Sequence, residues 1–104
     1  MTEDDDLERL RARLVEIDEE LIRLVGERLE SVLKIGAYKA ERGLPVLDPG
    51  QEAKVIRRAA AMAREAGVDE ELVRDIIWQI MAAARDAQEG RSRWGPPSPE
   101  TSDG

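Results

Sequence analysis

The sequence predicts an all-α protein, with three helices in each chain and a long first helix. Aromatic residues make up only 3% of the chain, phenylalanine is absent, and no run of β-branched residues occurs. Strands are therefore poorly supported. Apolar residues instead recur at helical spacing over long stretches, and the first proline is Pro45, so none breaks a helix before that position. The helical pattern decides the fold class.

The first helix is expected to run from about Asp5 to Glu41 and to stop at Gly43. Its weak points are Gly26 and Gly36, because glycine lowers helix stability. The apolar residues of its first half alternate at spacings of three and four, which is typical of a seam that packs against another helix. They are Leu7, Leu10, Leu14, Ile17, Leu21 and Leu24.

The two later helices have clear start and stop signals. Asp48 is placed to cap the second helix and Pro49 to occupy its first position, and Gly67 is placed to end it. Asp69 is the expected cap of the third helix, which ends by Gly90. The three helices account for the chain up to that glycine.

Length and composition limit the possible functions. A chain of 104 residues forms one domain, here expected at residues 1–90, followed by a disordered tail at 91–104. The net charge of −7 argues against a nucleic-acid partner. No apolar run is long enough to span a membrane, and the acidic N-terminus is unlike a signal peptide, so a cytoplasmic protein is expected. Without cysteine or histidine, the chemistry must use Arg, Lys, Gln and carboxylates.

The length of the first helix predicts a dimer. A helix of about 37 residues is roughly 55 Å long, whereas a compact domain of 100 residues has a radius of gyration of about 13 Å. Two shorter helices cannot cover such a rod, and a symmetric homodimer is the commonest way to bury the remaining seam. The alternative is a break near Gly26, which would give a monomeric four-helix bundle.

Cations interrupt the apolar seam of the first helix. Arg28 falls on a core position, and Lys39 lies about three full turns later on the same face. Arg11 lies about 100° around the helix from Arg28, so one helix cannot aim all three at one point. In an antiparallel or crossed dimer, Arg11 of one chain would meet Arg28 and Lys39 of the other. The alternative is that Arg28 and Lys39 snorkel or pair with carboxylates, and that Arg11 is a surface residue.

Further polar residues also have two interpretations. Helix capping is sufficient to account for Asp48 and Gln51, as the cap and its capping-box partner. Glu52 fits an ordinary first-turn acid, and Gln88 an ordinary polar residue late in the third helix. Taken singly, none of these residues indicates a site.

Taken together, these residues resemble a known family, the all-helical chorismate mutases. The resemblance covers residues 7 to about 89 and needs no insertion. It is carried by Leu10-Arg11, Ile17-Asp18, Leu21, Glu27-Arg28, Ile35-Gly36, Lys39, Gly43-Leu44-Pro45-Val46, Asp48, Glu52 and Gln88.

The resemblance implies an intertwined helical homodimer with two shared active sites. It also implies conversion of chorismate to prephenate by a Claisen rearrangement, on the route to phenylalanine and tyrosine. That reaction is unimolecular and pericyclic, so no cofactor, metal or nucleophile is expected, and the lack of His and Cys is compatible with catalysis. The enzyme must hold the enolpyruvyl arm over the ring and place a cation and a donor at the ether oxygen.

The resemblance assigns roles to the cations and to Gln88. Arg11 of the second chain and Arg28 would bind the two substrate carboxylates, for which the guanidinium fork is suited. Lys39 would reach a carboxylate and the ether oxygen, and Gln88 would donate a second hydrogen bond to that oxygen. The expected catalytic residues are Lys39, Gln88, Arg28 and Glu52.

The remaining expected substrate-binding residues lie in the second and third helices. Asp48 and Glu52 would sit near the ring hydroxyl, and a protonated Glu52 would donate towards the ether side. Two positions depart from the commonest pattern of the family. Gln51 stands where arginine is frequent, and Ala84 where a hydroxyl or other polar residue is frequent, which predicts an active but modest enzyme.

Other functions stay open at this point. Isochorismate-pyruvate lyase and 4-amino-4-deoxychorismate mutase use the same scaffold, although Asp48 and Glu52 favour a substrate with a 4-hydroxyl group. A non-catalytic regulatory dimer is a further alternative, as is dependence on an upstream enzyme of the aromatic pathway.

Overall fold

A computed structural model describes residues 3–90, which form three helices and no strand. They are α1 (Glu3–Glu41), α2 (Pro49–Ala66) and α3 (Glu70–Gln88). The prediction of an all-α chain with three helices is confirmed. The tail predicted at 91–104 lies outside the described residues.

Helix α1 begins two residues earlier than expected and continues through Gly26 and Gly36 to Glu41. The break considered near Gly26 does not occur. The helix ends where the backbone of Gly43 takes a positive φ of 67°, a conformation that glycine adopts without steric cost. The Leu44 N–H then donates to the Lys39 carbonyl at 2.9 Å, which satisfies a carbonyl left free at the helix end.

The starts of α2 and α3 follow the aspartates that the sequence indicated. The side chain of Asp48 accepts a hydrogen bond from the Gln51 backbone N–H at 3.1 Å, and Pro49 occupies the first turn. The side chain of Asp69 accepts from the Glu71 N–H at 2.8 Å. Each cap satisfies a backbone donor that a helix start leaves without a partner.

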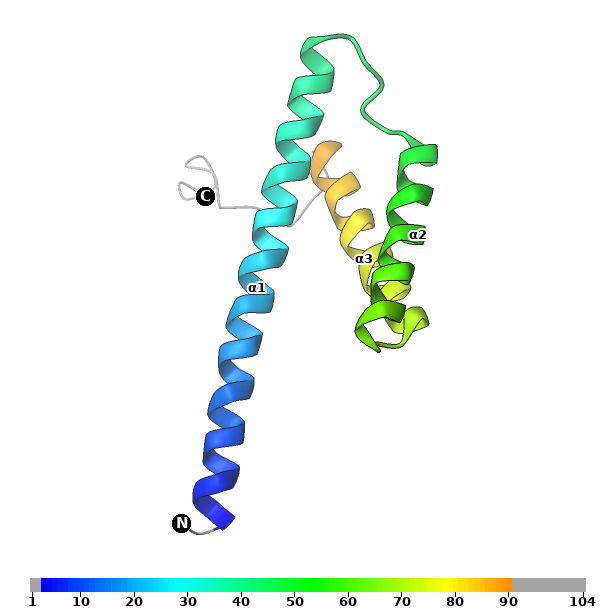
Figure 1. Ribbon diagram of the computed structural model, residues 1–104. Helices are drawn as coiled ribbons and strands as arrows, with labels where there is room; N and C mark the ends of the chain where they lie inside the picture. The colour runs from blue at the N-terminus through cyan, green and yellow to red at the C-terminus, as the bar shows by residue number, and fades with distance from the viewer. Residues whose placement is uncertain (1–2, 91–104) are drawn as a thin grey trace, which may run out of the picture.

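The helices pack as a hairpin beside one half of a rod. In Figure 1, α2 and α3 form the hairpin and lie next to the C-terminal half of α1, while the N-terminal half of α1 extends beyond them. The backbone of α3 lies close to those of both α1 and α2, whereas the backbones of α1 and α2 stay farther apart from each other. The radius of gyration of 18.0 Å is well above the roughly 13 Å of a compact domain of this size.

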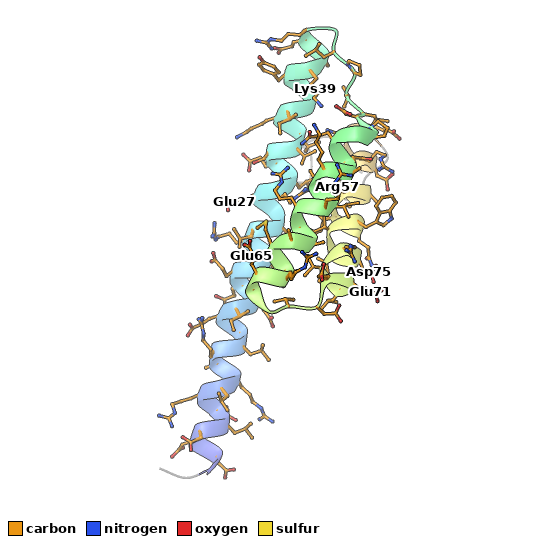
Figure 2. All side chains as sticks on the ribbon, turned by 45° about the vertical axis from the view of Figure 1, so that its right-hand side comes forward. Glu27, Lys39, Arg57, Glu65, Glu71 and Asp75 are labelled. Atoms are coloured by element: carbon orange, nitrogen blue, oxygen red, sulfur yellow. The ribbon has the colours of Figure 1, made fainter. Side chains whose placement is uncertain are left out.

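One chain buries very little of its apolar surface. Besides Gly36, the buried residues among those described are Leu29, Ala60, Ala63, Met81 and Ala84. The seam of the first half of α1 stays exposed, from Leu10 at 69% to Leu7 at 44%. Figure 2 shows the side chains of this half projecting into open space. None of the described helices is long and apolar enough to cross a membrane.

Candidate functional site

A pocket of about 210 Å³ opens where the C-terminal half of α1 faces the start of α2 and the end of α3. Its walls combine apolar side chains with three cations, two carboxylates and two amides. The lining residues are Arg28, Val32, Ile35, Lys39, Val46, Leu47, Asp48, Gln51, Glu52, Val55, Met81, Ala84, Arg85 and Gln88.

Helix α1 supplies two cations to this pocket. Arg28 and Lys39 lie on one face of the helix with Val32 and Ile35 between them, and both are half-buried. Figure 2 labels Lys39 near the C-terminal end of α1. Two positive charges beside an apolar wall form a place for an anion, because the low dielectric of that wall strengthens their attraction to it.

The start of α2 brings Asp48, Gln51 and Glu52 to the opposite wall. Asp48 and Gln51 are exposed, and Asp48 both caps the helix and lines the pocket. Its helix-capping role and a role in the site are therefore compatible. Glu52 is half-buried one turn into the helix.

A contact that the sequence analysis missed links α2 to α3. The Nη2 atom of Arg85 donates to both carboxylate oxygens of Glu52, at 2.8 and 2.9 Å. About 30% of the Arg85 side chain and 28% of the Glu52 side chain stay exposed. The hydrogen bond with Glu52 is the main cause that raises the pKa of Arg85, and the negative charge of Glu52 is the second. This guanidinium is therefore always protonated. Glu52 acts here as a hydrogen-bond acceptor.

A signal for Arg85 was present in the sequence. Met81, Arg85 and Gln88 are spaced by four and three residues, so they share one face of α3. An arginine between an apolar residue and a candidate site residue on one face is a reason to place it in the same site.

Gln88 reaches across from α3 to α1. Its Nε2 atom donates to the Val32 carbonyl at 3.2 Å. This approach depends on Gly36, which is buried and has no side chain. A Cβ atom at position 36 would lie 2.9 Å from Gln88 Nε2. Ala84, on the same helix, is buried at 3% exposure and lines the pocket.

Arg11 lies apart from the other predicted site residues within one chain. It is in the exposed half of α1, does not line the pocket, and pairs with Glu8 at 3.3 Å. The fold therefore brings together Arg28, Lys39, Asp48, Gln51, Glu52, Ala84 and Gln88, and leaves Arg11 outside. Residues 3–90 hold no cluster of three His, Cys, Asp or Glu residues that suits a metal ion.

Comparison with known proteins identifies one family. The sequence profile of chorismate mutase type II matches residues 10–89, which include every residue that lines the pocket. No solved structure matches the chain with significance.

Three relatives show how this domain is used elsewhere. A 4-amino-4-deoxychorismate mutase of Streptomyces venezuelae is 38% identical over 83% of this chain and 86% of its own length. A secreted chorismate mutase of Yersinia pestis is 38% identical over 68% of this chain and 39% of its own length. A T-protein of Haemophilus influenzae is 33% identical over 72% of this chain, which spans only 20% of that longer protein.

Proposed function

This chain belongs to the chorismate mutase type II family of isomerases, and on that premise we propose that it rearranges chorismate to prephenate in a site shared by two chains. The observation that carries this proposal is the pocket that combines Arg28, Lys39 and Gln88 with an apolar wall. Chorismate is a dianion that rearranges without a nucleophile. Its catalysis therefore requires fixed positive charge, a neutral hydrogen-bond donor and little water at the reacting atoms.

The rearrangement requires the protein to provide a pocket of suitable shape and a suitable distribution of charge. In the rearrangement the ether C–O bond breaks while a C–C bond forms between the enolpyruvyl arm and the ring, so no atom leaves the molecule. The apolar wall at Val32, Ile35 and Val55 favours the compact conformation in which the arm lies over the ring. As the C–O bond breaks, the ether oxygen gains negative charge, which a cation and a donor stabilise.

We assign these tasks to the residues that line the pocket. Arg28 binds one substrate carboxylate, and Lys39 binds a carboxylate and the ether oxygen. Gln88 keeps one amide N–H on the Val32 carbonyl and donates the other to the same oxygen, because an amide nitrogen carries two donors. Asp48 and Glu52 face the ring side and accept from the ring hydroxyl.

The exposed seam of α1 supports a homodimer. Leu7, Leu10, Leu14, Leu21 and Leu24 are between 44% and 69% exposed in the single chain. Covering each of these half-exposed leucines is worth about 1 kcal/mol, and a two-fold dimer gains that twice. We propose that α1 of each chain lies along the other chain and brings its Arg11 to the partner's pocket, as the second carboxylate-binding cation. The resulting dimer is intertwined.

Mixing two inactive variants tests the shared site. Arg11→Gln and Arg28→Gln each remove one cation, so each homodimer has only defective sites. After the two are unfolded and refolded together, random pairing makes about one site in four complete, with Arg28 from one chain and Arg11 from the other. We expect chorismate turnover to recover to about that fraction of the wild type. If the full-length wild-type protein does not turn over chorismate, the proposed activity is wrong. If the wild type is active but the mixed variants recover no turnover, only the proposal of a site shared by two chains is wrong.

A second substrate deserves a parallel assay. Two of the matched relatives are named 4-amino-4-deoxychorismate mutase, from Streptomyces venezuelae and Streptomyces pristinaespiralis. An ammonium group at the ring is stabilised by nearby carboxylates, and of the two on that side Glu52 already pairs with Arg85, which leaves Asp48. We therefore expect a higher kcat/KM for chorismate than for the amino compound. The same assay with isochorismate tests the lyase alternative, through release of pyruvate.

The place of the protein in the cell is also part of this proposal. We propose the cytoplasm. Fractionation of the source cells with an antibody against the chain tests it, and protein in the medium, as the name of the Yersinia pestis relative suggests for that protein, would contradict it.

A further inference from the structure

Arg85 is a cation of the pocket for which the roles assigned so far have no use. It lies on α3 one turn before Gln88 and one residue after Ala84, and all three line the pocket. Its guanidinium is fixed by two hydrogen bonds to Glu52. We propose that Arg85 is a further substrate-binding residue, which binds a carboxylate of the substrate in place of a cation at position 51.

The charge of the pocket supports this assignment. Arg28, Lys39 and Arg85 face Asp48 and Glu52, so the lining of one chain carries one net positive charge. Without Arg85 the lining of one chain would be neutral, and even with the proposed Arg11 of the second chain the site would carry one net positive charge, fewer than the two charges of a dianion. With Arg85, and with the proposed Arg11 of the second chain, the site carries two net positive charges, which match the two carboxylates of chorismate.

The position of Arg85 relative to Gln51 gives the second argument. Gln51 precedes Glu52 on α2, and the Arg85 guanidinium lies within 2.9 Å of the Glu52 carboxylate. The cation on α3 therefore reaches the wall to which residue 51 also belongs. Gln51 is neutral and donates only an ordinary hydrogen bond, whereas an arginine donates charged ones.

Glu52 then has a role in holding the arginine. Both observed bonds come from Nη2, and a guanidinium has five N–H donors. Arg85 keeps its contact with Glu52 and turns its remaining donors to the substrate carboxylate. Because Glu52 fixes the side chain beforehand, less rotamer entropy is lost when substrate binds.

The test compares single and double variants in the full-length dimer. It rests on the proposed function. Arg85→Gln is expected to raise KM for chorismate about 10- to 100-fold, the loss of a charged contact to a carboxylate, with kcat changed much less. Arg85→Gln combined with Gln51→Arg is expected to recover most of that loss, because the cation returns to the same wall. Arg74→Gln is the matched control, since it removes an equal charge from α3 at a residue outside the pocket.

A direct binding measurement separates this assignment from the activity. The probe is a cyclic ether dicarboxylate that imitates the transition state, titrated by calorimetry into each variant. Weaker binding by Arg85→Gln, restored by Gln51→Arg, supports the assignment. An active wild type whose Arg85→Gln variant keeps its KM and its affinity for the diacid overturns it and leaves the proposed function intact. If Arg85→Gln lowers kcat alone and Gln51→Arg does not restore it, Arg85 serves only to place Glu52, which also overturns it. A wild type without turnover or diacid binding overturns both proposals.

Discussion

Replacing Gly36 with alanine is expected to separate the stability of this protein from its activity. The new Cβ atom would lie 2.9 Å from Gln88 Nε2, closer than such atoms approach in proteins. Gly36 is buried on α1, and every atom that the new Cβ would meet belongs to the flexible side chain of Gln88, so that side chain yields before the helix backbone does. The amide of Gln88 must therefore move away from the Val32 carbonyl, to which it now donates at 3.2 Å.

The two consequences of this change differ in size. Loss of one neutral hydrogen bond costs about 0.5–1.5 kcal/mol, and alanine in place of glycine inside a helix returns about 1 kcal/mol. The free energy of unfolding should therefore change by less than about 1 kcal/mol. A displaced Gln88 no longer reaches the ether oxygen, where its bond to a developing negative charge is worth about 1.5–3 kcal/mol, so kcat should fall about 10- to 150-fold.

Chorismate consumption followed by ultraviolet absorbance measures kcat, and urea denaturation measures stability. Gly26→Ala is the matched control on the same helix, because nothing lies within 4 Å of a Cβ atom built there. This control should gain about 1 kcal/mol of stability and keep its activity. If Gly36→Ala keeps the wild-type kcat, Gln88 is not placed by this close contact and the reasoning is wrong.

Three further variants test other parts of the structure. Arg28→Leu should keep or slightly increase the melting temperature, since a half-buried cation stabilises the fold little, while kcat/KM falls by about 100-fold or more; an unfolded variant would show that Arg28 has a structural role instead. Leu14→Glu places a charge on the exposed seam and should convert the dimer to inactive monomers, which sedimentation velocity detects; an active dimer would contradict the assigned interface. The Arg64 guanidinium donates to Glu70 at 2.8 Å and holds the pKa of Glu70 below its usual 4.5. This pair therefore stabilises the fold above pH 4.5, and its contribution is lost as the pH falls through the lowered pKa. Glu70→Gln should remove that part of the acid dependence in urea denaturation at pH 3–6, and an unchanged slope would contradict it.

The sequence predicted the helices well because their signals are local. Asp48, Asp69, Gly43 and Gly67 start or end helices through contacts within a few residues. Such contacts depend on short spacings that can be read from the chain directly. The start of α1 was predicted two residues too late, because a row of acidic residues precedes Leu7 and several of them are compatible with a first turn.

The site was predicted in part, because some of its contacts join distant helices. Arg28 and Lys39 share a helix face, so periodicity alone placed them together. The pair of Glu52 and Arg85 joins residues 33 positions apart, and it depends on how α3 is rotated against α2. Helical spacing does not determine that rotation. The role of Arg11 depends on a second chain and stays a prediction.

Helix α3 acts as a spacer between the two walls of the pocket. Because the backbones of α1 and α2 each approach that of α3 but not one another, α3 holds the two walls apart, and its buried side chains there are Met81 and Ala84. Volume changes at these two positions would alter the width of the cleft while the charged groups stay on their own helices. Substitutions that change only the volume of these buried side chains can therefore change which ring substituents such an isomerase accepts, without altering the charged groups of the pocket.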